Sequence, residues 1–257
     1  LDLNKLSEKE MAAKLKSAAL RRYAPWLRDL RSFRPYQLSD DLEKLLHEKY
    51  VSGRAAWNRL FDETIAGLRF PYGKDMLTEP QIFEKLSGTD AAARKKAALT
   101  IGEVFREKAP LFALITNTLA KDKETEDQWR GFKQPISSRN VANYIEDEVV
   151  AALLSAVRKS YPDLSHRYYK LKAGWFGKKQ LEYWDRNAPL PGDADRTYSW
   201  NEGKELVLTA YGNFSKELAT VGKRFFDKPW IDAAVTPGKS PGAFAHPTVP
   251  SAHPYVL

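Results

Sequence analysis

The sequence predicts a mainly α-helical protein with a small β-sheet near its carboxyl end. Apolar residues recur every three or four positions through most of the chain, which is the period of a helix with one buried face. Two Ser–x–x–Glu pairs stand at the start of such segments, as in the capping box that begins a helix. After Phe225 the pattern changes: Pro and Gly recur every few residues, with Ala243–Phe244–Ala245 and Tyr255–Val256–Leu257 as short extended pieces.

The first part of the chain is predicted to be a series of helices. Their expected ranges are 7–24, 40–67, 80–86, 90–109 and 110–119. Ser7 and Glu10 have the capping-box spacing, and Asp90 can cap the fourth helix. Pro110 is expected to end that helix and can start the next one, because proline is tolerated in a first helical turn.

The second part is predicted to be helical as far as residue 225. A polar, charge-dense stretch, residues 119–135, is the best candidate domain boundary, and it divides the chain into residues 1–120 and 121–257. Helices are expected over 138–160, 163–177 and 199–225. A loop is expected at 185–195 and a short strand-favouring stretch at 196–200.

The composition restricts the classes of protein that the chain can represent. Its 257 residues are 43% hydrophobic and 29% charged, which is ordinary for a folded soluble protein. The lack of cysteine excludes disulfides and thiolate chemistry and favours a reducing compartment. The longest apolar run, Val149–Val157, is too short to span a bilayer, and the first residues lack signal-peptide features. We therefore expect a cytoplasmic protein with no membrane partner.

The formal net charge of +8 raises the question of nucleic-acid binding. The basic residues alternate with acidic ones almost everywhere, which is typical of solvated helix faces. Residues 166–184 interleave aromatic with basic side chains, as single-strand platforms do, but they fit better a helix that buries its aromatic side. A non-enzymatic basic helical module that binds single-stranded nucleic acid remains the alternative function.

Two local motifs resemble ligand sites but lack the required context. Gly238–Lys239–Ser240 ends like a phosphate loop, yet the first glycine of that motif would fall on Ala233, and Pro241 disfavours a helix start. His246 and His253 lie seven residues apart, each before a proline, and have no third ligand. The residues themselves contain no complete catalytic constellation, so no catalytic or metal-binding residue is predicted.

Five stretches carry a family resemblance: EKYVSGRAAWNRLFDETIAGLRF, RNVANYIEDEVVAALLSAV, HRYYKLKAGWFGKKQLEYWDRNAPLP, SWNEGKELVLTAYGNFSKELA and GKSPGAFAHPTVPSAHPYVL. In this order, from about Asp40 to Leu257, the chain resembles the oligoendopeptidase F family of zinc metallopeptidases, relatives of thimet oligopeptidase. The resemblance implies a multi-helix metallopeptidase-type fold with a deep channel, which cleaves short oligopeptides. It also implies a zinc ion held by an HExxH helix and a later Glu, downstream of the segment that resembles HPYVL.

The resemblance therefore implies an N-terminal region over residues 1–120 and an incomplete catalytic domain over 121–257 that stops before the zinc motif. We expect this chain alone to be inactive, and to associate with a complementary C-terminal portion or with itself. In the family, the strand matching Gly242, Ala243, Phe244 and Ala245 borders the zinc helix, which implies a substrate-aligning edge. An ordinary short strand is the alternative for these four residues.

Overall fold

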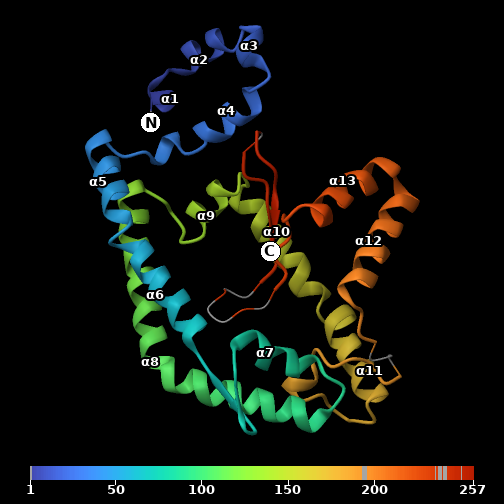
Figure 1. Ribbon diagram of the computed structural model, residues 1–257. Coiled ribbons are helices and arrows are strands. Elements are labelled where there is room, and N and C mark those ends of the chain that lie inside the picture. Colours follow the sequence, from blue (N-terminus) through green and yellow to red (C-terminus); the bar gives the residue numbers. More distant parts are fainter. Residues whose placement is uncertain (1, 193–195, 235, 237–238, 240–241, 250) are drawn as a thin grey trace. The chain divides into compact units, whose positions relative to one another are not determined.

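The computed structural model describes residues 2–192, 196–234, 236, 239, 242–249 and 251–257 (Figure 1). Its α-helices are α1 (Asp2–Lys5), α2 (Glu8–Lys14), α3 (Ala18–Arg21), α4 (Ala24–Arg31), α5 (Asp40–Tyr50), α6 (Arg54–Gly67), α7 (Glu79–Glu84), α8 (Ala91–Arg130), α9 (Ser137–Ala142), α10 (Asp147–Ser160), α11 (Arg167–Trp175), α12 (Trp200–Phe214) and α13 (Lys216–Asp227). Its strands are β1 (Phe70–Tyr72), β2 (Asp75–Leu77), β3 (Ala245–His246) and β4 (Tyr255–Val256). The predicted fold class, mainly helical with a small sheet near the carboxyl end, is confirmed.

The chain forms two compact units, and each unit is built from two separate chain segments. Unit one contains Leu1–Phe61 and Glu107–Lys170, and unit two contains Asp62–Arg106 and Leu171–Leu257. The predicted domain boundary at residue 120 lies inside α8 and stays a prediction. No helix in the described part of the chain is long and apolar enough to cross a membrane.

The helix starts that the sequence predicts from capping residues are present. Ser7 and Glu10 form a reciprocal capping box at α2, and Ser199 and Glu202 form another at α12. The Asp90 carboxylate accepts a hydrogen bond from the backbone N–H of Ala92 at 2.8 Å, as expected for a cap of α8. The stretch before α12 is not a strand, contrary to expectation, because Ser199 is committed to capping that helix.

Four of the predicted helices are interrupted. The helix expected over 7–24 is divided into α2 and α3 by residues 15–17, and the one expected over 199–225 into α12 and α13 at Ser215. The contacts at the other two interruptions can be identified. The helix expected over residues 40–67 is divided into α5 and α6 by a turn at residues 51–53. A Cβ atom at Gly53 would lie 2.9 Å from the carbonyl oxygen of Lys49, so this turn requires glycine. The helix expected over 138–160 is likewise divided into α9 and α10, and the Asp147 carboxylate at the start of α10 accepts hydrogen bonds from the side chains of Ser137 and Asn140 in α9.

At Pro110, by contrast, a predicted interruption is absent. It was expected to separate two helices, but α8 is continuous over 40 residues with Pro110 inside it. A proline removes one backbone donor and disturbs the preceding turn, at a cost of about 3 kcal/mol or more. The many other hydrogen bonds of so long a helix, and its buried Ala97 and Ile115, offset that cost.

The described core of unit two lies around a β-hairpin that the sequence analysis did not predict. β1 pairs antiparallel with β2, with Phe70 opposite Leu77, and Gly73 turns the chain with a positive φ of 70°. Phe70 and Ile82 are fully buried and pack with Leu68 and Ala97. The hairpin, α7 and the first part of α8 thus share one apolar core.

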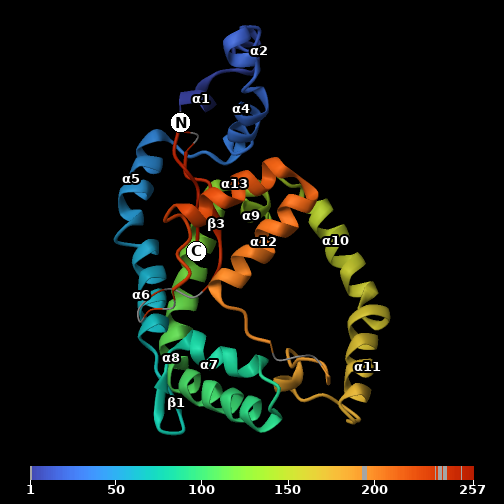
Figure 2. The ribbon, with the colours of Figure 1, turned by 45° about the vertical axis from the view of Figure 1, so that its right-hand side comes forward.

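α12 and α13 form a helical hairpin in the same unit, in which the two consecutive helices pack against each other (Figure 2). Gly222 permits their close approach, because a Cβ atom there would lie 2.8 Å from the Tyr211 ring. The Ser215 side chain accepts a hydrogen bond from the backbone N–H of Leu218 and so caps α13 immediately after α12 ends. This cap makes the connection between the two helices very short.

A buried ionic network joins the two chain segments of unit two. The Asp185 side chain is fully buried and accepts hydrogen bonds from Arg94, at 2.8 Å, and from Lys178. Arg94 also donates to the carbonyl oxygens of Gly88 and Thr89. Burial opposes ionisation of Asp185, but the hydrogen bonds from Arg94 and Lys178 outweigh it and hold the pKa of this carboxyl below its usual value.

Replacing Asp185 with Asn is expected to destabilise the chain by about 3–5 kcal/mol, because it leaves buried Arg94 without a counter-charge. The folded-state pKa is depressed, so the stabilisation is complete above an unfolded-state value of about 4 and is lost as the pH falls through the folded-state value. Urea unfolding at several pH values measures both effects. The exposed Asp75→Asn variant is the control, and an equal loss in that variant would contradict the role of the network.

Candidate functional site

The carboxyl-terminal residues form a small sheet in which, among the described residues, β4 has a neighbour on both sides and β3 on one side. β3 pairs antiparallel with β4, with Ala245 opposite Val256 and His246 opposite Tyr255. On the other side of β4, Val256 forms a parallel bridge with Ile231. The backbone of Val256 donates to Trp230 O and accepts from Asp232 N, both at 2.9 Å. β4 is therefore central, and β3 is the edge within the described part of the chain.

The four residues predicted to align substrate lie at or just before this edge. Only Ala245 is in β3, so the strand begins later than the predicted range 242–245. Gly242 has a φ of 132°, a conformation that favours glycine and delays the regular strand. Phe244 continues the pairing by exchanging two backbone hydrogen bonds with Leu257, at 3.0 and 2.9 Å. All four residues are exposed to solvent.

The direction of the Ala245 backbone follows from the pairing of Phe244. In an antiparallel ladder, hydrogen-bonded pairs alternate with pairs whose N–H and C=O groups point away from each other. Because Phe244 and Leu257 form a hydrogen-bonded pair, Ala245 and Val256 form the alternate kind. The N–H and C=O of Ala245 consequently face the open edge, where an added strand would pair.

A stack of rings supports the covered side of the sheet. The imidazole of His253 stacks on the Trp230 indole, with centroids 4.4 Å apart and planes inclined by 7°. The Tyr255 ring lies edge-on to the His253 imidazole, with centroids 4.5 Å apart, and the Arg224 guanidinium lies over Trp230. These contacts connect α13 to β4 and fix the strand on which β3 pairs.

The residues present do not fit the zinc site that the resemblance implies. Among the described residues, no group of three or more His, Asp and Glu side chains is arranged to hold a metal ion. His253 is engaged in its ring stack, and the Nδ1 atom of His246 accepts a hydrogen bond from the backbone of Thr248 at 3.1 Å. His47–Glu48 starts like an HExxH motif, but Val51 stands in place of the second histidine.

The phosphate-loop candidate gains no support from its lysine. The Nζ atom of Lys239 donates to the carbonyl oxygens of Asp232 and Ala234, at 3.0 and 2.8 Å, and also pairs with the Asp232 carboxylate. Gly238 and Ser240 lie outside the described residues. The amino group that would contact phosphate is therefore already occupied.

The segment 166–184 also commits two of its lysines to internal contacts. Lys172 is buried and donates to the carbonyl oxygens of Arg186 and Ala188, at 2.8 and 2.7 Å. Burial lowers the pKa of Lys172, and the nearby charge of Arg94 lowers it further. Lys178 pairs with Asp185. This arrangement is that of a structural anchor and does not favour the nucleic-acid alternative.

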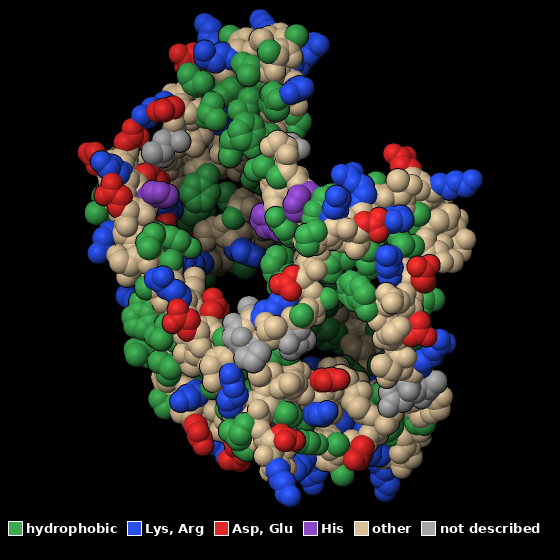
Figure 3. Space-filling view, in the orientation of Figure 1, with side chains coloured by type: hydrophobic (Ala, Val, Ile, Leu, Met, Phe, Trp, Pro, Cys, Tyr) green, Lys and Arg blue, Asp and Glu red, His purple; other side chains and the backbone are tan. Residues whose placement is uncertain are grey.

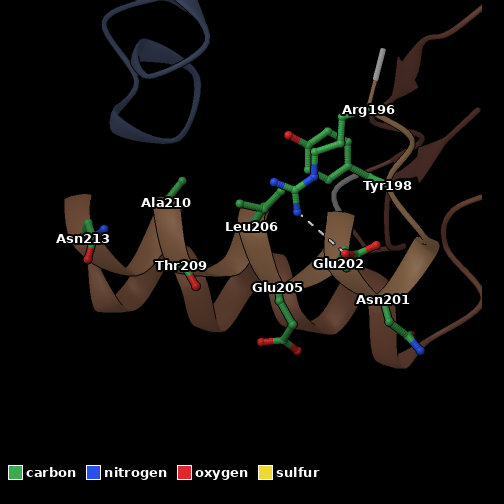
Figure 4. Close-up of a pocket in the computed structure, with 9 residues that line it drawn as sticks. All are labelled: Arg196, Tyr198, Asn201, Glu202, Glu205, Leu206, Thr209, Ala210 and Asn213. Atoms are coloured by element: carbon green, nitrogen blue, oxygen red, sulfur yellow. Dashed lines mark ion pairs between the residues drawn. The ribbon is translucent and has the colours of Figure 1, made fainter. Parts of the chain in front are cut away.

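A pocket of 630 Å³ lies along α12 (Figure 4). At its rim the Arg196 guanidinium stacks over the Tyr198 ring at 4.5 Å and lies 3.8 Å from the Glu202 carboxylate. In this view Arg196 and Tyr198 lie beside Leu206, whereas the Glu205 carboxylate points to the opposite side of the helix. The polar side chains that line this pocket do not point toward one common position, so they do not form an acid–base pair.

Apolar side chains are widely exposed on the helices of both units, and they colour much of the surface green in Figure 3. On α10 of unit one, Leu153 and Leu154 are 60% and 50% exposed. On α12 of unit two, Phe214 is 85% exposed and Leu206 55%. Neither helix buries any residue fully. Such exposure is typical of surfaces that another polypeptide covers.

Comparisons with known proteins agree on one family. The family described as Oligopeptidase F matches residues 2–70. Group B oligopeptidase PepB of Streptococcus agalactiae serotype III (strain NEM316) is 26% identical over 254 residues. Oligopeptidase PepF of Bacillus subtilis (strain 168) is 24% identical over 253 residues. Each of these two alignments covers 95% of this chain.

The fold agrees as well. The solved structure of Pz peptidase A with an inhibitor superposes with a TM-score of 0.78 at 18% identity, and it covers 92% of this chain. The chain spans 41% of the length of PepB, 37% of PepF and 42% of the Pz peptidase A chain. The predicted resemblance to the oligoendopeptidase F family is therefore confirmed, over about two fifths of the length of these proteins.

The open edge has a measurable consequence. The amide of Ala245 should exchange its hydrogen with solvent faster than the amides of Phe244, Val256 and Leu257, which are bonded inside the sheet. Amide exchange followed by NMR on the 257-residue chain measures this directly. Protection of Ala245 equal to that of Phe244 would mean that another group already occupies the edge.

Proposed function

We propose, from its confirmed resemblance to the oligoendopeptidase F family, that this chain is a portion of a zinc metalloendopeptidase that hydrolyses short oligopeptides. Its contribution is structural: its helices form wall of the substrate channel, and β3 aligns the peptide. The observation that carries the second role is the outward-facing backbone of Ala245 on an exposed edge strand. The cysteine-free composition supports a cytoplasmic site of action.

The alignment would use main-chain hydrogen bonds. In an extended peptide that adds to β3, a backbone carbonyl accepts a hydrogen bond from the Ala245 N–H, and a backbone N–H donates one to the Ala245 carbonyl oxygen. Both bonds use only main-chain groups, so they do not depend on the peptide's sequence. Small side chains at Gly242, Ala243 and Ala245 leave room for a close approach of the peptide backbone. Such binding selects an extended conformation and fits short, flexible peptides better than folded proteins.

The zinc ligands and the catalytic base are proposed to lie outside this chain, since its described residues do not form such a site. We further propose that the complementary C-terminal portion of the same protein covers the exposed apolar faces of α10 and α12. The fraction of its relatives that this chain spans supports that assignment. Self-association through the same faces is the alternative when that portion is absent.

The isolated chain is expected to show no zinc-dependent peptide hydrolysis. Mixing it with the separately expressed C-terminal portion should produce activity and a heterodimer, because only then are zinc and substrate edge present together. A quenched fluorescent peptide assay and light scattering measure the two results. Zinc-dependent turnover by the isolated chain, at a purity verified by intact mass, would disprove the assignment of the catalytic groups.

Replacing Ala245 with Pro in the complete enzyme should lower kcat/KM by about tenfold, because proline removes one outward N–H while the bonds between β3 and β4 use other residues. Ala245→Ser keeps that N–H and is the matched control, expected to remain near wild type. Peptide hydrolysis under identical zinc loading gives the comparison. Equal activity of the Pro and Ser variants would be incompatible with strand addition at β3.

A further inference from the structure

We propose that unit one contains an oxyanion-binding site formed by Arg54 and Arg139, which takes a phosphate group or a comparable small oxyanion. The two arginines line a pocket of 260 Å³ together with Lys123 and Arg130, two carboxylates, and the rings of Phe33 and Phe132. All of these residues belong to unit one. The proposal depends on which of the four cations are already satisfied.

Arg130 is fully used by the protein. Its side chain is 8% exposed, and its guanidinium donates to both oxygens of the Glu43 carboxylate, at 2.6 and 3.0 Å. It also donates to Glu126 at 2.7 Å and to the carbonyl oxygen of Tyr36 at 3.2 Å. Hydrogen bonding to Arg130 lowers the pKa of Glu43 although burial opposes the shift, so this pair stays ionised. Arg130 therefore has little capacity for a ligand.

Lys123 is satisfied in the same way. Its ammonium group has three donors, and it contacts three acceptors: the Asp127 carboxylate, the Pro135 carbonyl oxygen at 2.7 Å and the Ser138 hydroxyl at 2.9 Å. Lys123 and Arg130 thus occupy the carboxylates of the pocket, Asp127 and Glu126. The negative charges of these two carboxylates are therefore compensated by Lys123 and Arg130.

Arg54 and Arg139 have no such partners. Neither guanidinium forms a hydrogen bond or ion pair with any side chain or carbonyl in the described part of the chain, whereas each carries five N–H donors. Four cations and two carboxylates line the pocket, so its lining carries more positive than negative charge. Arg54 is half-buried, and Arg139 is exposed and accessible from solvent.

The chemistry of these two groups selects the ligand class. A guanidinium is planar and binds phosphate or carboxylate oxygens with two parallel hydrogen bonds. At about 30 Å³ per water molecule, the pocket has room for roughly eight waters, which is enough for a phosphate and a small organic substituent. Phe33 and Phe132, with ring centroids 5.9 Å apart, supply an apolar wall for such a substituent.

Isothermal titration of the 257-residue chain with inorganic phosphate, at constant ionic strength, tests the site. Saturable binding is expected, and Arg54→Gln and Arg139→Gln should each weaken it about tenfold or more, because each removes charge-assisted hydrogen bonds. Arg59→Gln is the matched control: Arg59 is exposed on the same helix as Arg54, has no ion pair among the described residues and does not line the pocket. Thermal unfolding verifies that all three variants fold.

Phenyl phosphate and acetate in the same titration distinguish the source of the oxyanion. Tighter binding of phenyl phosphate than of phosphate indicates a phosphomonoester, the reverse order indicates free phosphate, and acetate binding as tight as phosphate indicates a carboxylate. Each of these results supports the site when the Arg54 and Arg139 variants weaken it. No saturable binding by the wild-type chain, or an equal loss in Arg59→Gln, overturns it.

Discussion

The buried ion pair between Arg94 and Asp185 is the contact on which unit two depends. These residues lie 91 positions apart, in the two chain segments that make up the unit. A buried carboxylate is tolerated only when its charge is compensated and its oxygens are hydrogen-bonded, so the geometry around Asp185 has little freedom. Arg94 ties the start of α8 to this loop, and Lys172 holds the loop's next carbonyl groups. The network thereby holds the loop at residues 185–188 against α8 and α11.

The sheet at the carboxyl end combines a centre that is hydrogen-bonded on both sides with an exposed edge. β4 is bonded on both sides and carries the Trp230–His253 stack, whereas β3 has a partner on one side within the described residues. An open edge is a liability for association unless it serves recognition. In the proposed function, a peptide that adds to β3 would meet a backbone already held in the strand conformation by β4.

Helix starts and helix interruptions differ in how far the local sequence specifies them. Starts depend on a side chain and a backbone N–H three residues apart, so Ser7–Glu10 and Ser199–Glu202 were predictable. Interruptions depended on contacts outside the periodic pattern: Gly53 against the Lys49 carbonyl, and Asp147 turning back to Ser137 and Asn140. The interruption predicted at Pro110 is absent, because the stability of a 40-residue helix outweighs one lost hydrogen bond.

The sequence by itself determined the helical class, the caps, the small carboxyl-terminal sheet and the family resemblance, because each is recorded in residues close together or in order along the chain. Only the tertiary structure decided that the Ala245 N–H faces outward and that Arg94 neutralises Asp185. It also decided that, among the described residues, Lys123 and Arg130 have side-chain partners whereas Arg54 and Arg139 have none. The physical reason is that pairing across a strand or between distant charges depends on which groups meet in space. Residue type and spacing do not specify those meetings.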